Sequence, residues 1–263
     1  MKKYLFIFKS ELMSSLQYVF NIFVTFIGYF LIMFIFLNVW KYIYSNPNEI
    51  IHGYTMNQMI WYIMITEVLW YVGAGKRYCQ KIVEDVRGGN IAYNISKPYN
   101  YIIYSLSAHL GSRLVSAVLY TTFGLVLGYL FLGSFPNLQI IDIIPILITG
   151  IMAIIINTLL VTFIGLFSFI IEDANPFYWL YSKLILVLGT TFPIEYFPKF
   201  IRGILSYSPI YVVSYGPAKL FVDFSWNSFI HIIIADIIYL FISYILCTLI
   251  YKKGVKKLNV NGG

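Results

Sequence analysis

The chain has 263 residues, of which 60% are hydrophobic and 11% are charged, and its formal net charge is +7 at pH 7. A mean hydropathy of +0.78 excludes an ordinary soluble domain, because water would meet far more apolar surface than such a fold can bury. On so apolar a chain, the positive charge indicates membrane topology and attraction to anionic headgroups rather than nucleic-acid binding.

Long apolar runs predict an all-α polytopic membrane protein. A bilayer core about 30 Å thick needs roughly 20 helical residues, and runs such as "FNIFVTFIGYFLIMFIFLNVW" have that length. Strands of a membrane barrel would instead alternate over about 10 residues. Proline-containing breaks such as "SNPNE", "GSFPN" and "EDANP" separate the runs. Six spans are predicted, at residues 18–40, 57–75, 107–132, 143–171, 177–192 and 228–251.

The first segment, residues 1–17, predicts an amphipathic helix in the inner membrane interface. Apolar side chains recur there at three- and four-residue spacing: Leu5, Phe8, Leu12, Leu16 and Val19. Lys9 and Glu11 interrupt the apolar run, and no small-residue cleavage site follows, so we do not expect a signal peptide.

The segment between the second and third spans is the most polar part of the chain. "KRYCQKIVEDVR" predicts a helix over 76–87, with Tyr78, Ile82 and Val86 on one face. Gly88 and Gly89 are suited to end it in a left-handed cap. The pattern alone leaves two interpretations open: a helix that docks on a partner protein, or a helix that lies on the lipid headgroups.

Three polar residues fall inside predicted spans, where ionisable side chains cost about 2.5 to 3.5 kcal/mol on insertion scales. Glu67 is either a residue of a substrate pathway or a neutral or paired carboxyl between helices. Asn157 is expected to join helices by hydrogen bonds and is also a candidate pathway residue. Asp236 is expected to pair with a cation of the outer side: Lys199, Arg202 or Lys219.

Small and sulfur-containing residues have simpler interpretations. Gly124 and Gly128 have a spacing that permits close approach of helices, and we expect them to pack within the chain. Cys79 and Cys247 are placed near the cytoplasmic side, where thiols stay reduced, so no disulfide is expected.

The positions of Lys and Arg predict that both termini and residues 76–103 are cytoplasmic, because short loops rich in these residues stay inside. Fourteen of the basic residues then lie on the inner side, and four lie outside: Lys41, Lys199, Arg202 and Lys219. The predicted location is therefore the cytoplasmic membrane.

Enzyme motifs are absent from the sequence. "GAGKRY" is not a phosphate-binding loop, because Trp70 stands in place of its first glycine and Arg77 in place of its Ser or Thr. His52, His109 and His231 fall on different loops and span ends, so they are not expected to share a metal. We expect no cofactor, metal or catalytic residue in this chain.

The run "DVRGGNIAYNISKPYNY" resembles the signature of the type 2 ABC exporter permeases. The matching positions are Asp85, Val86, Gly89, Ile91, Ala92, Ile95, Lys97, Pro98 and Tyr101. Lys97 stands where the family more usually has arginine. The likeness covers essentially the whole chain: the outer segment with Pro209 and Pro217 resembles the family's re-entrant region, and "YKKGVKKLNVNGG" resembles its cytoplasmic tail.

The resemblance implies one permease domain over residues 1–263. Its parts would be the interfacial helix 1–17, spans one and two within 18–75, a coupling segment 76–103, spans three to five within 107–192, an outer re-entrant or short-helix segment 193–227, span six at 228–251 and a tail 252–263.

The implied function is that of the membrane subunit of an ATP-driven exporter. It would work as a dimer, with a second copy or a paralogous permease, and would couple to separate ATPase subunits that bind ATP and Mg. The implied coupling contacts are Ile82, Glu84, Asp85, Val86, Arg87, Gly89, Ile91, Lys97 and Pro98.

An alternative is a secondary carrier, or a membrane-embedded resistance or immunity protein without an ATPase. A carrier would be expected to show inverted repeats with interrupted helices, and no convincing similarity joins the two halves of this sequence.

Overall fold

The computed structural model describes residues 2–44, 46 and 49–261, apart from the side chains of Ile95 and of residues 257–261. Nearly all of this part of the chain is helical, which confirms the predicted all-α class. The longer helices are α1 (Lys2–Leu16), α2 (Val19–Ile43), α3 (Met56–Val72), α4 (Lys76–Arg87), α6 (Tyr101–Leu132), α7 (Ile143–Leu166), α8 (Asn175–Ile185) and α11 (Trp226–Asn261).

Short elements connect these helices. A hairpin pairs β1 (Ile50–Ile51) with β2 (Tyr54–Thr55) in antiparallel fashion, with Ile50 opposite Thr55. The remaining short helices are α5 (Asn90–Ile95), η1 (Ile140–Asp142), η2 (Phe167–Phe169), the π-helical η3 (Leu186–Thr190), η4 (Ile194–Tyr196), α9 (Lys199–Ser206), the π-helical η5 (Tyr211–Tyr215) and α10 (Gly216–Val222).

Four helical stretches of the described chain are long and apolar enough to cross a bilayer: Val19–Ile43, Tyr101–Leu132, Ile140–Phe169 and Trp226–Lys256. They correspond to the predicted spans one, three, four and six, with ends that differ by a few residues. The second predicted span is α3, whose 17 residues reach about 26 Å. The fifth is divided between α8 and η3. The count of six spans therefore stays a prediction.

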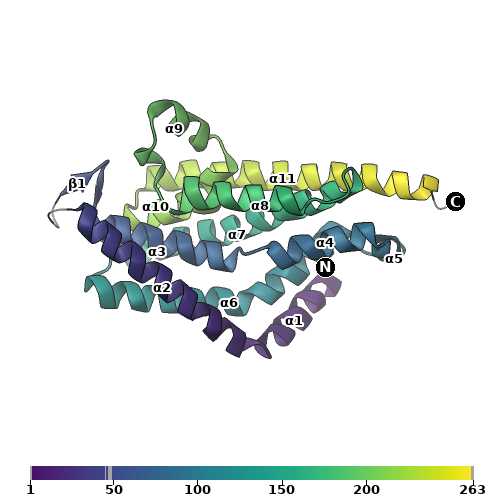
Figure 1. Cartoon of the computed structure of the whole chain (residues 1–263), viewed down its shortest axis with the longest axis horizontal. Helices are drawn as coiled ribbons and strands as arrows, with labels where there is room; N and C mark the ends of the chain where they lie inside the picture. The colour runs from purple at the N-terminus through teal and green to yellow at the C-terminus, as the bar shows by residue number, and fades with distance from the viewer. Residues whose placement is uncertain (1, 45, 47–48, 262–263) are drawn as a thin grey trace.

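Helix α3 lies in the half of the molecule that holds the hairpin (Figure 1), where it packs against α2, α6 and α10. Trp61, Tyr62 and Met59 on this helix are completely buried. Thr55 begins the helix with a capping box, in which the Thr55 hydroxyl accepts from the Gln58 amide while the Gln58 side chain accepts from the Thr55 amide. Because protein surrounds α3 on all sides, its sequence is apolar and has no polar face.

Two glycines of α6 allow this dense packing. A Cβ atom at Gly124 would lie 2.7 Å from the Val68 side chain, and one at Gly128 would overlap the Trp61 ring. Both neighbours belong to α3, so the prediction that these glycines pack within the chain is confirmed.

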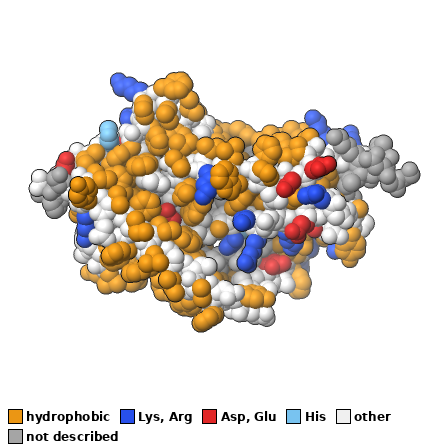
Figure 2. Space-filling model, in the orientation of Figure 1, with side chains coloured by type: hydrophobic (Ala, Val, Ile, Leu, Met, Phe, Trp, Pro, Cys, Tyr) orange, Lys and Arg blue, Asp and Glu red, His pale blue; other side chains and the backbone are white. Residues whose placement is uncertain are grey.

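The two termini and the α4–α5 segment lie in the same half of the molecule, and the hairpin and α9 lie in the other half (Figure 1). On the face shown in Figure 2, hydrophobic side chains cover most of the surface, while charged side chains gather in the half that holds α1 and α4. The positions of Lys and Arg predict that both termini and residues 76–103 share one side, and these segments lie in one half of the molecule.

The last two segments differ in detail from expectation. The expected tail from residue 252 continues α11 as one helix to Asn261. The outer segment forms short helices, and η5 and α10 return into the core, where Val212, Ala218 and Leu220 are completely buried.

Candidate functional site

Helix α4 forms and ends as its sequence predicts. The Gly88 amide donates to the Glu84 carbonyl at 2.8 Å, and Gly89 follows with φ of +73°, a conformation that glycine adopts without a steric cost. Tyr78, Ile82 and Val86 are all buried, which confirms the predicted apolar face.

The apolar face of α4 is covered by the chain itself. Ile82, Val83, Val86 and Ile91 belong to a buried cluster with residues of α6, α7 and α11, among them Leu159. Ile82 and Ile91 are 1% and 0% exposed, so a partner protein cannot touch them in this conformation. Three of the residues implied as coupling contacts, Ile82, Val86 and Ile91, thus hold the segment to the membrane helices.

The charged residues of α4 divide into two groups. Glu84 and Arg87 are exposed, together with Gly89. Asp85 is half-buried, and its carboxylate accepts a hydrogen bond from the Tyr101 hydroxyl at 3.1 Å. Asp85 therefore ties α4 to the start of α6, in addition to any contact with a partner.

Beyond Gly89, α5 carries an exposed aromatic ring that the sequence analysis did not single out. Tyr93 is 68% exposed, and the Lys97 ammonium lies 4.0 Å from the centre of its ring. Pro98 is exposed beside them, while the side chain of Ile95 lies outside the described residues. The sequence does contain a signal for this residue: Tyr93 stands in a polar segment, and tyrosine rings are enriched at protein interfaces.

Helix α1 braces this segment. It packs along α6, where a Cβ atom at Gly111 would overlap the backbone of Phe8. At its beginning, Lys3 donates to the Pro98 carbonyl, and the Asn100 amide donates to the Tyr4 hydroxyl at 2.8 Å. The predicted apolar face of α1 is divided: Phe8 and Leu12 are half-buried, while Leu5 and Leu16 are exposed.

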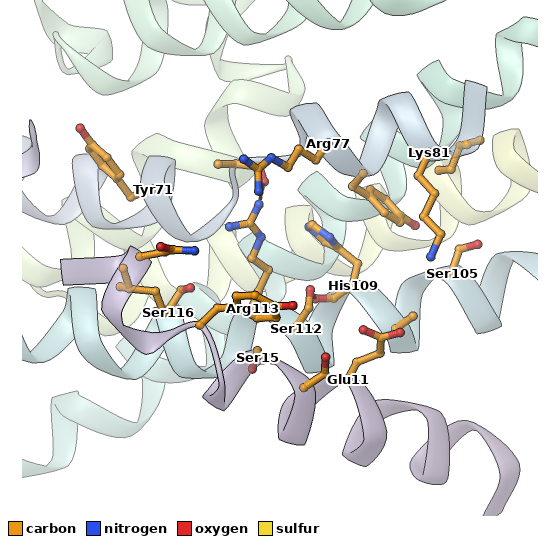
Figure 3. Close-up of a pocket in the computed structure, with 18 of the residues that line it drawn as sticks. Glu11, Ser15, Tyr71, Arg77, Lys81, Ser105, His109, Ser112, Arg113 and Ser116 are labelled. Carbon is orange, nitrogen blue, oxygen red and sulfur yellow. Dashed lines mark hydrogen bonds between the residues drawn. The ribbon is translucent and has the colours of Figure 1, made fainter. Parts of the chain in front are cut away.

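A cavity of about 740 Å³ opens between α1, the start of α2, the α3–α4 junction and α6 (Figure 3). Arg77 and Lys81 enter it from α4, His109 and Arg113 from α6, and Glu11 from α1. In the sequence, Arg77, Lys81 and Arg113 indicate only topology, because spacing along the chain does not show that α4 and α6 bring them together.

The two cysteines lie in the buried cluster around α4 and have free thiols. Burial raises the pKa of the Cys79 thiol to about 12, so at pH 7 it stays protonated and is a poor nucleophile.

Asn157 joins three helices, as predicted. Its amide nitrogen donates to the Gly73 carbonyl at 2.9 Å, and its carbonyl oxygen accepts from the Tyr181 hydroxyl at 2.8 Å. Glu67 is 2% exposed on α3 and does not line the large cavity. A role for either residue in a substrate pathway stays a prediction.

The ion pair predicted for Asp236 is wrong. Neither carboxylate oxygen of Asp236 has a hydrogen-bond partner among the described residues, although the side chain is completely buried. Arg202 instead donates to the Glu195 carbonyl at 2.7 Å, and Lys219 pairs with Asp223 at 2.7 Å. The reason is local: α11 turns Asp236 into the core, whereas these cations find partners within their own segments.

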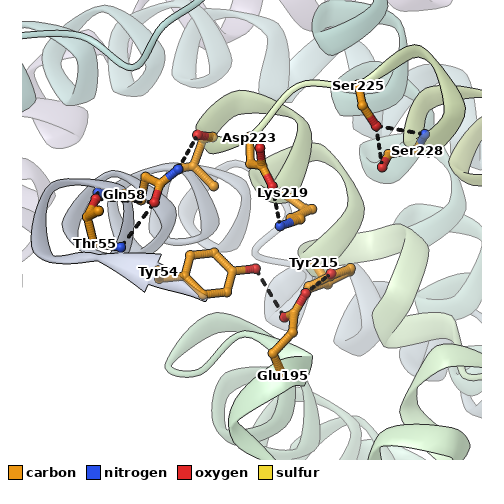
Figure 4. A network of polar contacts seen from close by, with 10 residues as sticks. Tyr54, Thr55, Gln58, Glu195, Tyr215, Lys219, Asp223, Ser225 and Ser228 are labelled. Atoms are coloured by element: carbon orange, nitrogen blue, oxygen red, sulfur yellow. Dashed lines mark hydrogen bonds and ion pairs between the residues drawn. The ribbon is translucent and has the colours of Figure 1, made fainter. Parts of the chain in front are cut away.

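Glu195 is the centre of a polar network in the half opposite the termini (Figure 4). Its two carboxylate oxygens accept from the Tyr54 hydroxyl at 3.0 Å and the Tyr215 hydroxyl at 2.5 Å. The network joins the hairpin, the turn before α9 and η5, and so fixes the outer segment on the end of α3.

Replacing Asp236 with asparagine is expected to stabilise the protein by about 1 kcal/mol at pH 8, because the variant no longer holds an ionisable group without a partner in an apolar setting. Thermal unfolding in detergent measures the change. Asp223→Asn is the matched control and should cost at most about 1 kcal/mol, as for an exposed ion pair. A loss of stability in Asp236→Asn would contradict the prediction and indicate a cationic partner.

Fold and surface together define a helical polytopic membrane protein with a polar segment anchored beneath its spans. The model of the ABC-2 family transporter proteins matches residues 26–262. The chain belongs to this family, and so is a membrane protein of the ABC-transporter permease type. The family associates in general with ABC ATPase subunits, and its members are typically membrane subunits without catalytic activity of their own. No curated protein matches the chain.

Proposed function

We propose that the chain is the membrane-spanning subunit of an ATP-driven exporter, assembled as a dimer of permeases with two separate ATPase subunits. The partner of this chain is a second copy or a paralogous permease, and ATP and Mg bind in the ATPases. The observation that carries the proposal is the α4–α5 segment of an ABC-2 family chain, which exposes polar and aromatic side chains while its apolar face is buried among the membrane helices.

In the proposed mechanism, α4–α5 transmits movement. Glu84, Arg87 and Tyr93 are free to contact an ATPase, with complementary charges at the rim and an aromatic anchor. Ile82 and Val86 pack into the cluster with α7 and α11, and close-packed interiors transmit displacement rather than absorb it. An ATPase that moves the exposed side of α4 therefore moves the spans behind it.

Lys97 and Pro98 extend this transmission to α1. The Lys97 ammonium lies against Tyr93, and the Pro98 carbonyl accepts from Lys3. Movement of α5 thus reaches the helix that packs along α6.

The proposed orientation is in the cell membrane with both termini cytoplasmic. The excess of Lys and Arg in the segments around α1, α4 and the end of α11 supports it. In a dimer, Glu67 and Asn157 are our candidates for residues beside the substrate pathway between the two permeases.

Co-expression with any ABC ATPase encoded beside this chain tests the function. We expect the ATPase to co-purify, its hydrolysis rate to change on assembly, and crosslinking in membranes to trap two permease chains in one complex. Crosslinking with disuccinimidyl suberate in the presence and absence of the ATPase gives the stoichiometry.

Two results would remove the proposal. If neither the neighbouring ATPase nor any other ABC ATPase of the cell binds, the chain works without one, as a secondary carrier or a resistance or immunity protein would. If the ATPase binds but crosslinking traps only single permease chains, the dimer is wrong and the coupling stands.

A further inference from the structure

The cavity under α1 brings together cations that have no anionic partner. Arg77 and Arg113 line it, and their side chains point toward one another (Figure 3). No ion pair of Arg77 or Arg113 with a carboxylate is found among the described residues. Two guanidinium groups that point toward one another repel, and an anion between them would offset the repulsion.

The remaining polar groups of the cavity do not neutralise this pair. Arg113 donates to the Ala74 carbonyl, which places its guanidinium but supplies no charge. The Asp85 carboxylate accepts from Tyr101, and Glu11 enters from α1 on the side of Ser105 and His109 (Figure 3). A third cation, Lys81, faces that second side. The arginine side of the cavity is therefore a region of uncompensated positive charge.

The surroundings of the cavity indicate where an anion would come from. Its walls include α1 and the start of α2, which expose apolar side chains to the outside: Leu5, Phe6, Met13, Leu16 and Phe20. Such side chains suit the boundary between headgroups and acyl chains. The volume of about 740 Å³ is ample for a headgroup and lies within the range of ligand pockets.

We propose that this cavity is a binding site for a phosphate group, held by Arg77 and Arg113. Guanidinium groups donate paired hydrogen bonds that match the oxygens of phosphate. The phosphate belongs either to an anionic lipid headgroup that enters beside α1 or to a soluble phosphate. Its binding can be measured without an ATPase, since every residue in the site comes from this chain.

Calorimetric titration of the purified chain, without any ATPase, tests the site. The probes are dioctanoyl phosphatidylglycerol, dioctanoyl phosphatidylcholine as the zwitterionic lipid with the same chains, and inorganic phosphate. We expect saturable binding of an anionic probe, at least about tenfold tighter for phosphatidylglycerol than for phosphatidylcholine if the lipid is the source. Saturation by inorganic phosphate with equal affinity identifies a soluble phosphate instead.

Three variants make the test specific. Arg77→Gln removes an exposed side chain with no hydrogen bond among the described residues, so the fold should be kept while binding weakens about tenfold or more. Arg113→Lys keeps the charge but loses the forked donor, and should weaken binding less. Lys9→Gln removes the same charge from an exposed position on α1 outside the cavity, and should leave affinity within about twofold.

The proposal is overturned if no anionic probe binds saturably. It is overturned equally if Arg77→Gln binds as tightly as Lys9→Gln, because the attraction then reflects the net charge of the chain. Unchanged melting temperatures of Arg77→Gln and Lys9→Gln establish that lost affinity is not lost folding.

Discussion

Replacing Tyr93 with alanine is expected to weaken binding of the partner ATPase roughly thirtyfold and to abolish coupled transport. Tyr93 is 68% exposed on α5, beyond the glycine turn that ends α4. Exposed tyrosines that become buried at an interface commonly contribute about 2 kcal/mol or more, which corresponds to that factor. Because the ring packs on no buried cluster of the chain, its removal should not disturb the fold. Affinity for the ATPase and stimulated hydrolysis measure the effect.

The matched control for Tyr93→Ala is Tyr42→Ala. Tyr42 is 89% exposed near the end of α2, in the half of the molecule away from α4–α5. This variant should bind the ATPase like the unmodified chain. Equal affinity of Tyr93→Ala and Tyr42→Ala, at equal expression, would show that α5 is not part of the ATPase contact.

The variant Glu84→Lys, measured in the same way, distinguishes two interpretations of α4: a helix that docks on an ATPase and a helix that lies on lipid headgroups. An added lysine on a lipid-bound helix should strengthen attraction to anionic membranes by about 1 kcal/mol. At a protein interface the reversed charge should weaken docking instead. Glu84 serves better than Asp85 here, because Asp85 also bonds to Tyr101 within the chain.

Replacing Gly111 with leucine is expected to displace α1 from α6 and to reduce both stability and transport. Even a Cβ atom at this position would overlap the Phe8 backbone, and a backbone cannot turn aside as a side chain can. Overpacking of this kind lowers the free energy of unfolding by about 1 to 3 kcal/mol. Here it is expected to detach α1 from α6. Loss of α1 would also break its contacts through Lys3 and Tyr4 to the end of the coupling segment.

Limited proteolysis and thermal unfolding check the Gly111 prediction. Gly150→Leu is the control, since a Cβ atom at Gly150 of α7 meets no neighbouring atom within 4 Å. We expect cleavage within α1 to accelerate in Gly111→Leu and not in Gly150→Leu. If α1 stays protected in both variants and transport is unchanged, the brace that we assign to α1 does not exist.

Much of the local structure could be predicted from the sequence, because it depends on local chemistry. The apolar run lengths identify a helical membrane protein, and the spacing of Tyr78, Ile82 and Val86 predicts α4 together with its buried face. The glycine pair predicts the end of that helix, and Gly89 adopts the left-handed conformation. The signature around residues 85–101 predicts the family, which the match over residues 26–262 confirms.

The tertiary structure alone decided what covers each apolar face. In a membrane protein, lipid and protein accept the same apolar side chains, so periodicity cannot distinguish a face that packs from one that meets lipid. For this reason the sequence could not show that the chain itself buries Ile82 and Ile91, which the family resemblance implies as coupling contacts. It also could not show that Asp236 turns into the core, away from the cations near it in topology, or that Arg77 and Arg113 meet in one cavity. Both outcomes depend on how α4, α6 and α11 cross their neighbours, and helix crossing is set by the packing of many side chains at once.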